Sequence, residues 1–187
     1  MQKDSFCREI LKINDNKLVD NLSKITEMRH LHKGEILIHE GEIQEKFVFL
    51  LDGILRGFFL DIKGRDITDC FGYQCGTPGM SCFTNRAPSP ISIEALTECK
   101  LLQISGDALM KLMKESTKLL WIYNELLQAA LRSHWEMKTM ICQHTAMERY
   151  QWFLQAYPGL VKKVNDKHIA SFLGMNPVTL SRLKHAL

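Results

Sequence analysis

The stretch Val164–Leu187, VNDKHIASFLGMNPVTLSRLKHAL, decides how the rest of this 187-residue chain is interpreted. It predicts two short helices joined by a tight turn. Asn165 or Asp166 is suited to cap the first helix, because both side chains accept hydrogen bonds from free backbone N–H groups. Gly174 ends that helix, where the backbone needs a positive φ. Its inward face is expected to be apolar and consists of Ile169, Ala170 and Leu173.

The second helix of this stretch has a buried side and a polar side. Asn176 caps it, and Pro177 occupies the first helical position, where its missing N–H costs nothing. Leu180, Leu183 and Leu187 share one side and are expected to pack inward. The opposite side is short and basic, which suits the DNA major groove and indicates a helix-turn-helix. The residues predicted to contact DNA are Asn176, Val178, Thr179, Ser181, Arg182, Lys184 and His185, with Lys167 on the first helix.

The charge distribution points in the same direction. Thr145–Leu187 contains six Lys or Arg residues and two acids, a net charge of +4, whereas the whole chain carries +3. Residues 1–144 therefore carry −1, and the basic excess belongs to the segment expected to meet phosphates. The alternative is an ordinary pair of helices that only covers a core.

Composition restricts the class of protein. With 45% hydrophobic and 24% charged residues, the chain is an ordinary globular protein with no membrane-spanning run or secretory signal, and we expect it to be cytoplasmic. The nearest approach to a metal pattern, Cys70, Cys75 and Cys82, matches no zinc or cluster spacing, so reduced thiols are expected and no cofactor or metal. No nucleophile elbow, P-loop or metalloprotease motif occurs, which argues against an enzyme.

The first half of the chain predicts a small β-domain. A helix is expected over Asn14–Ile25, capped by Asn14 or Asp15. Short apolar runs then alternate with turn glycines from Arg29 to Ser105, which is typical of a compact barrel or roll. Asp52-Gly53 gives a strong hairpin signal and Lys63-Gly64 a weaker one.

A long helix is predicted to follow over 116–144. Its apolar stripe is most simply buried against a second copy of the chain, giving a homodimer, although packing within the chain is the alternative. Thr145 and Glu148 form a capping box that starts the next helix. The predicted division is a β-roll domain at 1–115, a dimerisation helix at 116–144 and a helix-turn-helix domain at 145–187.

This order of parts resembles the Crp–Fnr family of bacterial transcription regulators. The resemblance rests on Gly41 with FVFLLDGILR, on AMERY and YPGL, and on HIASFLGMNPVTLSR. It implies an α+β protein: an N-terminal, cupin-like β-roll (a double-stranded barrel), a long dimerisation helix and a small C-terminal helix-turn-helix domain. It also implies a homodimer that binds a pseudo-palindromic DNA site, with RNA polymerase as a partner and a small-molecule effector.

Carried over by position, Arg182 matches a family arginine that contacts guanine, and Thr179 and Ser181 match residues near phosphates. Val178 departs from a common glutamate. At the effector site Tyr73 stands where cyclic-AMP-binding members have Glu, and Ser89 stands where they have Arg, so tight cyclic-nucleotide binding is not expected. The effector is unknown, and the candidate pocket residues are Phe71, Gly72, Tyr73, Ser89, Ser92 and Tyr123.

Two other functions remain open at this point. One is a ligand-binding or protein-interaction module whose C-terminal helices only pack. The other is a redox or haem sensor regulator built on the same scaffold.

Overall fold

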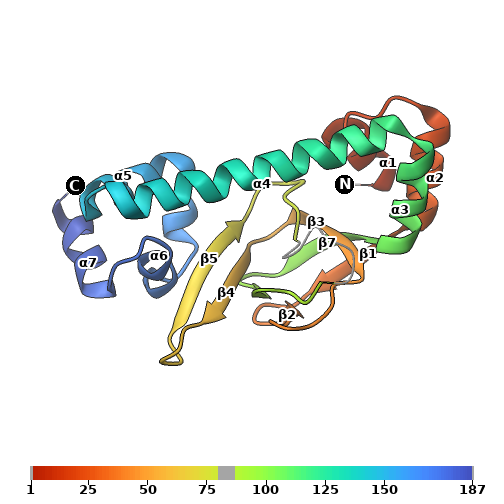
Figure 1. The fold of residues 1–187 in the computed structure, drawn as a ribbon. Coiled ribbons are helices and arrows are strands. Elements are labelled where there is room, and N and C mark those ends of the chain that lie inside the picture. Colours follow the sequence, from red (N-terminus) through yellow and green to blue (C-terminus); the bar gives the residue numbers. More distant parts are fainter. Residues whose placement is uncertain (1, 80–86, 187) are drawn as a thin grey trace. The chain divides into compact units, whose positions relative to one another are not determined.

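The computed structural model describes residues 2–79 and 87–186. The chain forms two compact units. The first contains Met1–Gly57 and Phe71–Leu127, and the second contains Phe58–Cys70 and Gln128–Leu187. The chain passes from one unit to the other within the long helix α4 (Thr117–Gln143), which is continuous along its length (Figure 1).

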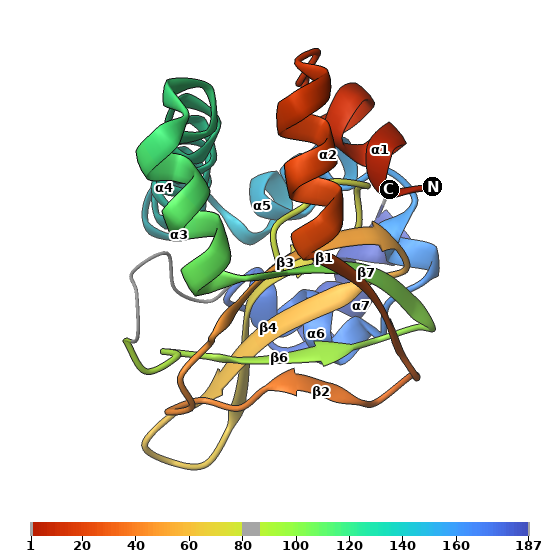
Figure 2. The same cartoon turned by 90° about the vertical axis from the view of Figure 1, so that its right-hand side faces the viewer.

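The strands form two sheets (Figure 2). They belong to the first unit except for the end of β4 and most of β5, which lie in the second. In one sheet the strand order is β1-β7-β3, and in the other it is β2-β6-β4-β5. The bounds are β1 (Thr26–Leu31), β2 (Ile36–Ile38), β3 (Lys46–Asp52), β4 (Leu55–Leu60), β5 (Asp66–Gly72), β6 (Ser92–Ala95) and β7 (Cys99–Ser105). The mixed α and β composition and the predicted roll are therefore present.

Strand β3 is apolar at consecutive positions because both of its faces are buried. Val48 and Leu50 point between the two sheets, into a core shared with Leu31, Leu101 and other residues of the sandwich. Phe49 and Leu51 point the other way, into a second core beneath the helices. Because side chains alternate across a strand, burial on both faces requires a continuous apolar run rather than an alternating one.

Helices cover the outer face of the sheet β1-β7-β3 (Figure 2). They are α1 (Lys3–Ser5), the π-helix η1 (Phe6–Ile10), α2 (Asn16–Ile25) and α3 (Gly106–Glu115). The predicted cap of α2 is Asp15, whose carboxylate accepts from the Leu18 N–H at 3.0 Å. Ser105 caps α3, its side chain accepting from the Ala108 N–H. Val19 and Leu22 of α2 are fully buried, which anchors this helix to the sheet.

The hairpin predicted at Asp52-Gly53 is wrong. Strands β3 and β4 on either side of it lie in different sheets, so the turn is a corner of the roll. Gly53 has φ +105°, and a Cβ there would come within 2.5 Å of the Glu98 carbonyl oxygen. The close approach of the 98–99 segment allows the chain to cross between sheets, and only glycine fits that space. The weaker signal, Lys63-Gly64, does connect the paired strands β4 and β5.

A charged pair lies inside the roll. Arg56 on β4 is 1% exposed, and its Nε lies 2.6 Å from Oε1 of Glu94 on β6. Replacing Arg56 with methionine would leave the Glu94 carboxylate without this cation. We expect the free energy of unfolding in urea to fall by about 3–5 kcal/mol. The double replacement Arg56→Met with Glu94→Leu should recover most of the loss, and two equally unstable variants would show that the pair is not the cause.

The second unit contains the end of α4 and the helices that follow it. They are α5 (Ala146–Ala156), the 3₁₀ helix η2 (Leu160–Lys162), α6 (Asp166–Phe172) and α7 (Pro177–Ala186). An aromatic cluster of Trp152, Phe153, Tyr157 and Phe172 holds α5 against α6, with ring centroids 5.1–6.3 Å apart. In the part of the chain that the structure describes, no helix is long and apolar enough to cross a membrane.

Candidate functional site

The two predicted helices at the C-terminal end are confirmed, with their caps. The Asn165 side chain accepts from the Lys167 N–H at 2.9 Å, and Asn165 rather than Asp166 is therefore the first cap. Gly174 has φ +62°, so the turn after α6 uses the left-handed backbone expected of it. The Asn176 side chain accepts from the Thr179 N–H at 2.7 Å and begins α7, with Pro177 as its first residue.

Helix α7 has the two faces expected from its sequence. Leu180 is completely buried and Leu183 is half-buried, whereas Leu187 lies outside the described residues. Thr179, between the two faces, is also half-buried. The outward side chains are exposed and consist of Asn176, Val178, Ser181, Arg182 and His185. An exposed guanidinium on a short, polar helix face can reach base edges without rearrangement of the protein.

The two lysines predicted to contact DNA differ in their surroundings. Lys167 on α6 is exposed. The Lys184 ammonium forms an ion pair with the Asp166 carboxylate, which links α7 to the first turn of α6. The two residues are 18 positions apart, so the local sequence pattern did not predict this ion pair. It links the two helices, and Lys184 would have to leave Asp166 in order to bind a phosphate.

A serine of α6 makes a contact that the sequence analysis missed. The Ser171 hydroxyl accepts from the Thr68 N–H at 2.9 Å and donates to the Asp66 carbonyl at 3.2 Å. Both partners are backbone groups of β5, which is the edge strand of its sheet. An edge strand leaves such groups without a ladder partner. Ser171 therefore satisfies two of them and holds α6 on this strand.

The capping box at the start of α5 is confirmed. Thr145 donates its backbone N–H to the Glu148 carboxylate at 2.8 Å, and the Glu148 N–H donates to the Thr145 hydroxyl. The Thr145 N–H and then the Thr145 hydroxyl lower the pKa of Glu148 below its ordinary value. The stabilisation is therefore complete at neutral pH and is lost as the pH falls through that lowered pKa.

Helix α4 is only partly covered by its own chain. Leu119 is buried, and Ile122, Tyr123 and Leu126 pack against the core beneath the helices. Five large apolar side chains on the same helix are 40–65% exposed, namely Leu120, Trp121, Leu131, Trp135 and Ile141. Only Leu120 and Ile141 of these five belong to the predicted apolar stripe, so α4 also exposes apolar side chains outside it, at Trp121, Leu131 and Trp135.

The six candidate effector residues differ in burial and in what their polar groups contact. Phe71, Ser89 and Ser92 are buried, whereas Gly72, Tyr73 and Tyr123 are half-buried. The Ser92 hydroxyl accepts from the Glu40 N–H at 2.9 Å, and the Ser89 hydroxyl donates to the Ile91 carbonyl. Both hydroxyls therefore hold neighbouring loop backbone.

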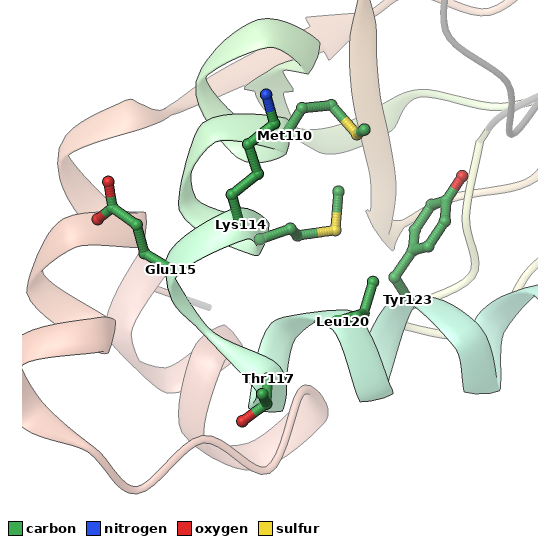
Figure 3. Close-up of a pocket in the computed structure, with 7 residues that line it drawn as sticks. Met110, Lys114, Glu115, Thr117, Leu120 and Tyr123 are labelled. Atoms are coloured by element: carbon green, nitrogen blue, oxygen red, sulfur yellow. The ribbon is translucent and has the colours of Figure 1, made fainter.

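Figure 3 shows a pocket of about 410 Å³ at the junction of α3 and α4. Of the six candidates, only Tyr123 lines it. Its other lining residues are Met110, Met113, Lys114, Glu115, Thr117 and Leu120. The Tyr123 ring packs edge-on against Phe47, 6.0 Å between centroids, which holds it at the pocket wall.

The surroundings of Ser89 support the expectation of weak cyclic-nucleotide binding. A cyclic phosphate needs a charged donor, and Ser89 supplies only a hydroxyl that is already donating. The buried Arg56 is engaged by Glu94. We expect calorimetric titration with cyclic AMP to show no binding at micromolar concentrations. A dissociation constant of about 1 μM or below, some −8 kcal/mol, would contradict this.

Metal binding finds no support in the described ranges. Within residues 2–79 and 87–186, no group of three or more His, Cys, Asp or Glu side chains is placed to hold a metal ion. Cys70 and Cys75 are exposed thiols, and partial desolvation of its sulfur raises the pKa of Cys75. Cys82, the third member of the predicted pattern, lies outside the described residues.

Comparison with known proteins gives a family match for the roll and similar solved structures for most of the chain. Residues 28–116 match the cyclic nucleotide-binding domain family. By sequence, none of the curated proteins matches the chain. FixK2 from Bradyrhizobium japonicum has a similar structure, with a TM-score of 0.78 and 19% identity over 87% of this chain and 84% of FixK2.

Two further solved structures are similar over most of their length. The c-di-GMP responsive regulator CLP of Xanthomonas campestris has a TM-score of 0.74 and 13% identity, over 92% of this chain and 91% of CLP. A structure from Eubacterium rectale, described as a regulator of the Crp/Fnr family, has a TM-score of 0.69 and 21% identity over 92% and 82% of the two chains. The fold predicted from the resemblance is confirmed.

Proposed function

We propose that this chain, whose residues 28–116 match the cyclic nucleotide-binding domain family, is a dimeric, sequence-specific DNA-binding transcription regulator of the Crp–Fnr type. The observation that carries the proposal is α7. It is a capped helix with Leu180 buried behind it and Arg182 exposed in front. Residues 145–187 form the DNA-binding part, and 1–115 form the sensor.

DNA contacts in this proposal divide into two kinds. Arg182 reads guanine, because its planar guanidinium can donate to O6 and N7 together. Lys167, Thr179 and Ser181 lie where they can approach phosphates, which fix the register but carry no sequence information. Val178 can only touch a thymine methyl group, so the base it faces is weakly specified.

Exposed apolar side chains on α4 support dimerisation. Leu131 and Trp135 lie one turn apart and are both more than half exposed. Two copies of α4 packed along these side chains, within 116–144, would remove both side chains from water. A two-fold dimer places two copies of α7 on successive major grooves, about 34 Å apart, and therefore requires a pseudo-palindromic site.

Regulation in this proposal passes from the roll to α7. A small-molecule effector, not cyclic AMP, changes the relative placement of the two recognition helices by shifting a population. RNA polymerase is the expected partner on the promoter.

The experiment that tests the proposal is selection of bound duplexes from a random library, followed by titration of the selected duplex at several salt concentrations. We expect one enriched pseudo-palindrome and an affinity that falls steeply with salt, because bound phosphates release counterions. Absence of any enriched sequence, or binding independent of salt, would instead identify a module whose C-terminal helices only pack.

A further inference from the structure

The junction between α4 and α5 leaves a carbonyl group free. In a continuous helix the Ile141 carbonyl would accept from the N–H of Thr145, four residues later. That N–H is instead donated to the Glu148 carboxylate in the capping box, at 2.8 Å. The Ile141 carbonyl is thus one of the unsatisfied groups at the C-terminal end of α4, where the helix dipole is negative.

Arg149 approaches this free carbonyl. Its Nη1 donates to the Ile141 oxygen in a long hydrogen bond of 3.5 Å. Its Nε is buried and, within the described residues, has no hydrogen-bond partner. A guanidinium at this place complements the negative end of α4. Arg149, on α5, therefore connects the first turn of its own helix to the last turn of α4.

The same guanidinium lies against the turn between α6 and α7. A Cβ added to Gly174 would come 3.4 Å from Arg149 Nη1 and 3.7 Å from Cγ2 of Ile141. The end of α4, the start of α5 and the turn before α7 thus meet at one point. We call Ile141, Arg149 and Gly174 the α4–α7 joint.

We propose that Arg149 is a positioning residue that fixes α7 relative to the end of α4, and that it thereby sets the spacing between the two DNA half-sites. This rests on the proposed function, since it requires a dimer that binds DNA. A short side chain at 149 would leave the Ile141 carbonyl without its donor and the Gly174 turn without its packing partner. The turn could then move relative to α4 while α7 itself remained intact.

This role differs from a direct phosphate contact. An arginine that binds phosphate must present its nitrogen atoms to solvent. Arg149 instead has a buried Nε and directs Nη1 to a backbone carbonyl. Loss of a phosphate contact would weaken binding to every sequence and reduce the salt slope by about one. Loss of a positioning residue leaves each half-site contact intact and changes only how two of them combine.

The test measures spacing preference with the full chain. The selected operator is synthesised with its spacer unchanged, one base pair longer and one shorter, and a duplex with a single half-site is included. One base pair moves a half-site by about 3.4 Å and rotates it by about 35°, so we expect wild type to lose about tenfold or more in affinity. For Arg149→Met we expect a loss of about threefold or less, with single half-site affinity and salt slope unchanged.

Two controls make the result specific. Arg132→Met removes the same charge from an exposed position of α4 and should keep the wild-type spacing preference. Arg149→Lys retains a charged donor and should restore the preference in part. Should Arg149→Met fail to fold by circular dichroism, Arg149→Gln serves the same purpose, because its amide is too short to replace the guanidinium.

Each outcome decides the matter. A folded Arg149 variant with wild-type spacing preference would overturn the proposal. So would a weaker single half-site complex with a reduced salt slope, since that would identify a phosphate contact. If wild type itself binds no duplex, the proposed function fails, and this is distinguished from failure of Arg149 to position α7.

Discussion

Replacement of Arg182 with alanine is expected to weaken binding to the selected duplex by about 1–3 kcal/mol for each half-site, roughly 5- to 150-fold for each, and to relax the requirement for one guanine in each half-site. The physical reason is the exposed position of Arg182 on α7, behind which Leu180 is buried. Truncation removes two hydrogen bonds to one base without disturbing the helix core. The measurement is fluorescence anisotropy with the selected duplex and with duplexes substituted at each position.

Arg132→Ala is the control for charge, because it removes one positive charge from an exposed position away from α7. It should change affinity by less than about threefold at moderate salt. Equal affinities of wild type and Arg182→Ala on every duplex would show that Arg182 reads no base.

A charge introduced among the exposed apolar side chains of α4 is expected to prevent dimerisation. Leu131 is 59% exposed. In a two-fold dimer Leu131→Glu would place two carboxylates close together in an apolar contact, where neither is solvated. We expect a monomer by light scattering. Its affinity for the pseudo-palindrome should fall by about 100-fold or more, because two half-sites no longer bind as one unit.

Ser133→Glu is the matched control on the same helix. Ser133 is exposed and lies two residues beyond Leu131, on the opposite side of the helix. The new charge should leave dimerisation and affinity unchanged. A Leu131→Glu protein that remains a dimer would place the interface elsewhere.

Local signals in the sequence were sufficient for the helices at the C-terminal end. The caps Asn165 and Asn176 and the positive φ of Gly174 all depend on groups within four residues of each other. The capping box of Thr145 is of the same kind. Such features follow from side chains that satisfy neighbouring backbone groups, so one short stretch contains the whole physical cause.

The features that the sequence did not predict depend on distant segments. Asp52-Gly53 has the composition of a hairpin turn, and only the approach of Glu98 makes it a corner between sheets. In the sequence Ser171 is an ordinary polar helix residue, and only the fold brings its hydroxyl to the backbone of the edge strand β5. Arg149 stands inside the recognised AMERY motif, yet its contact with the Gly174 turn requires the folded second unit.

The effector site stays a prediction. The expected pocket was assembled by alignment to the family's cyclic-nucleotide cassette, and Ser89 and Ser92 proved to use their hydroxyls on local backbone. The pocket in Figure 3 lies where α3 meets α4, and no local pattern in the sequence specifies the angle between these helices. Ligand cavities depend on how elements pack, and the same residues can line or miss one after a small rotation.

The central claim is that two copies of α7 bind two half-sites together. Hydroxyl-radical footprinting of the protein on its selected operator tests it most directly. The account predicts two protected half-sites whose centres lie about 10 base pairs apart, on one face of the duplex, with both lost together in Leu131→Glu. A single protected half-site, or uniform protection without a boundary, would contradict it.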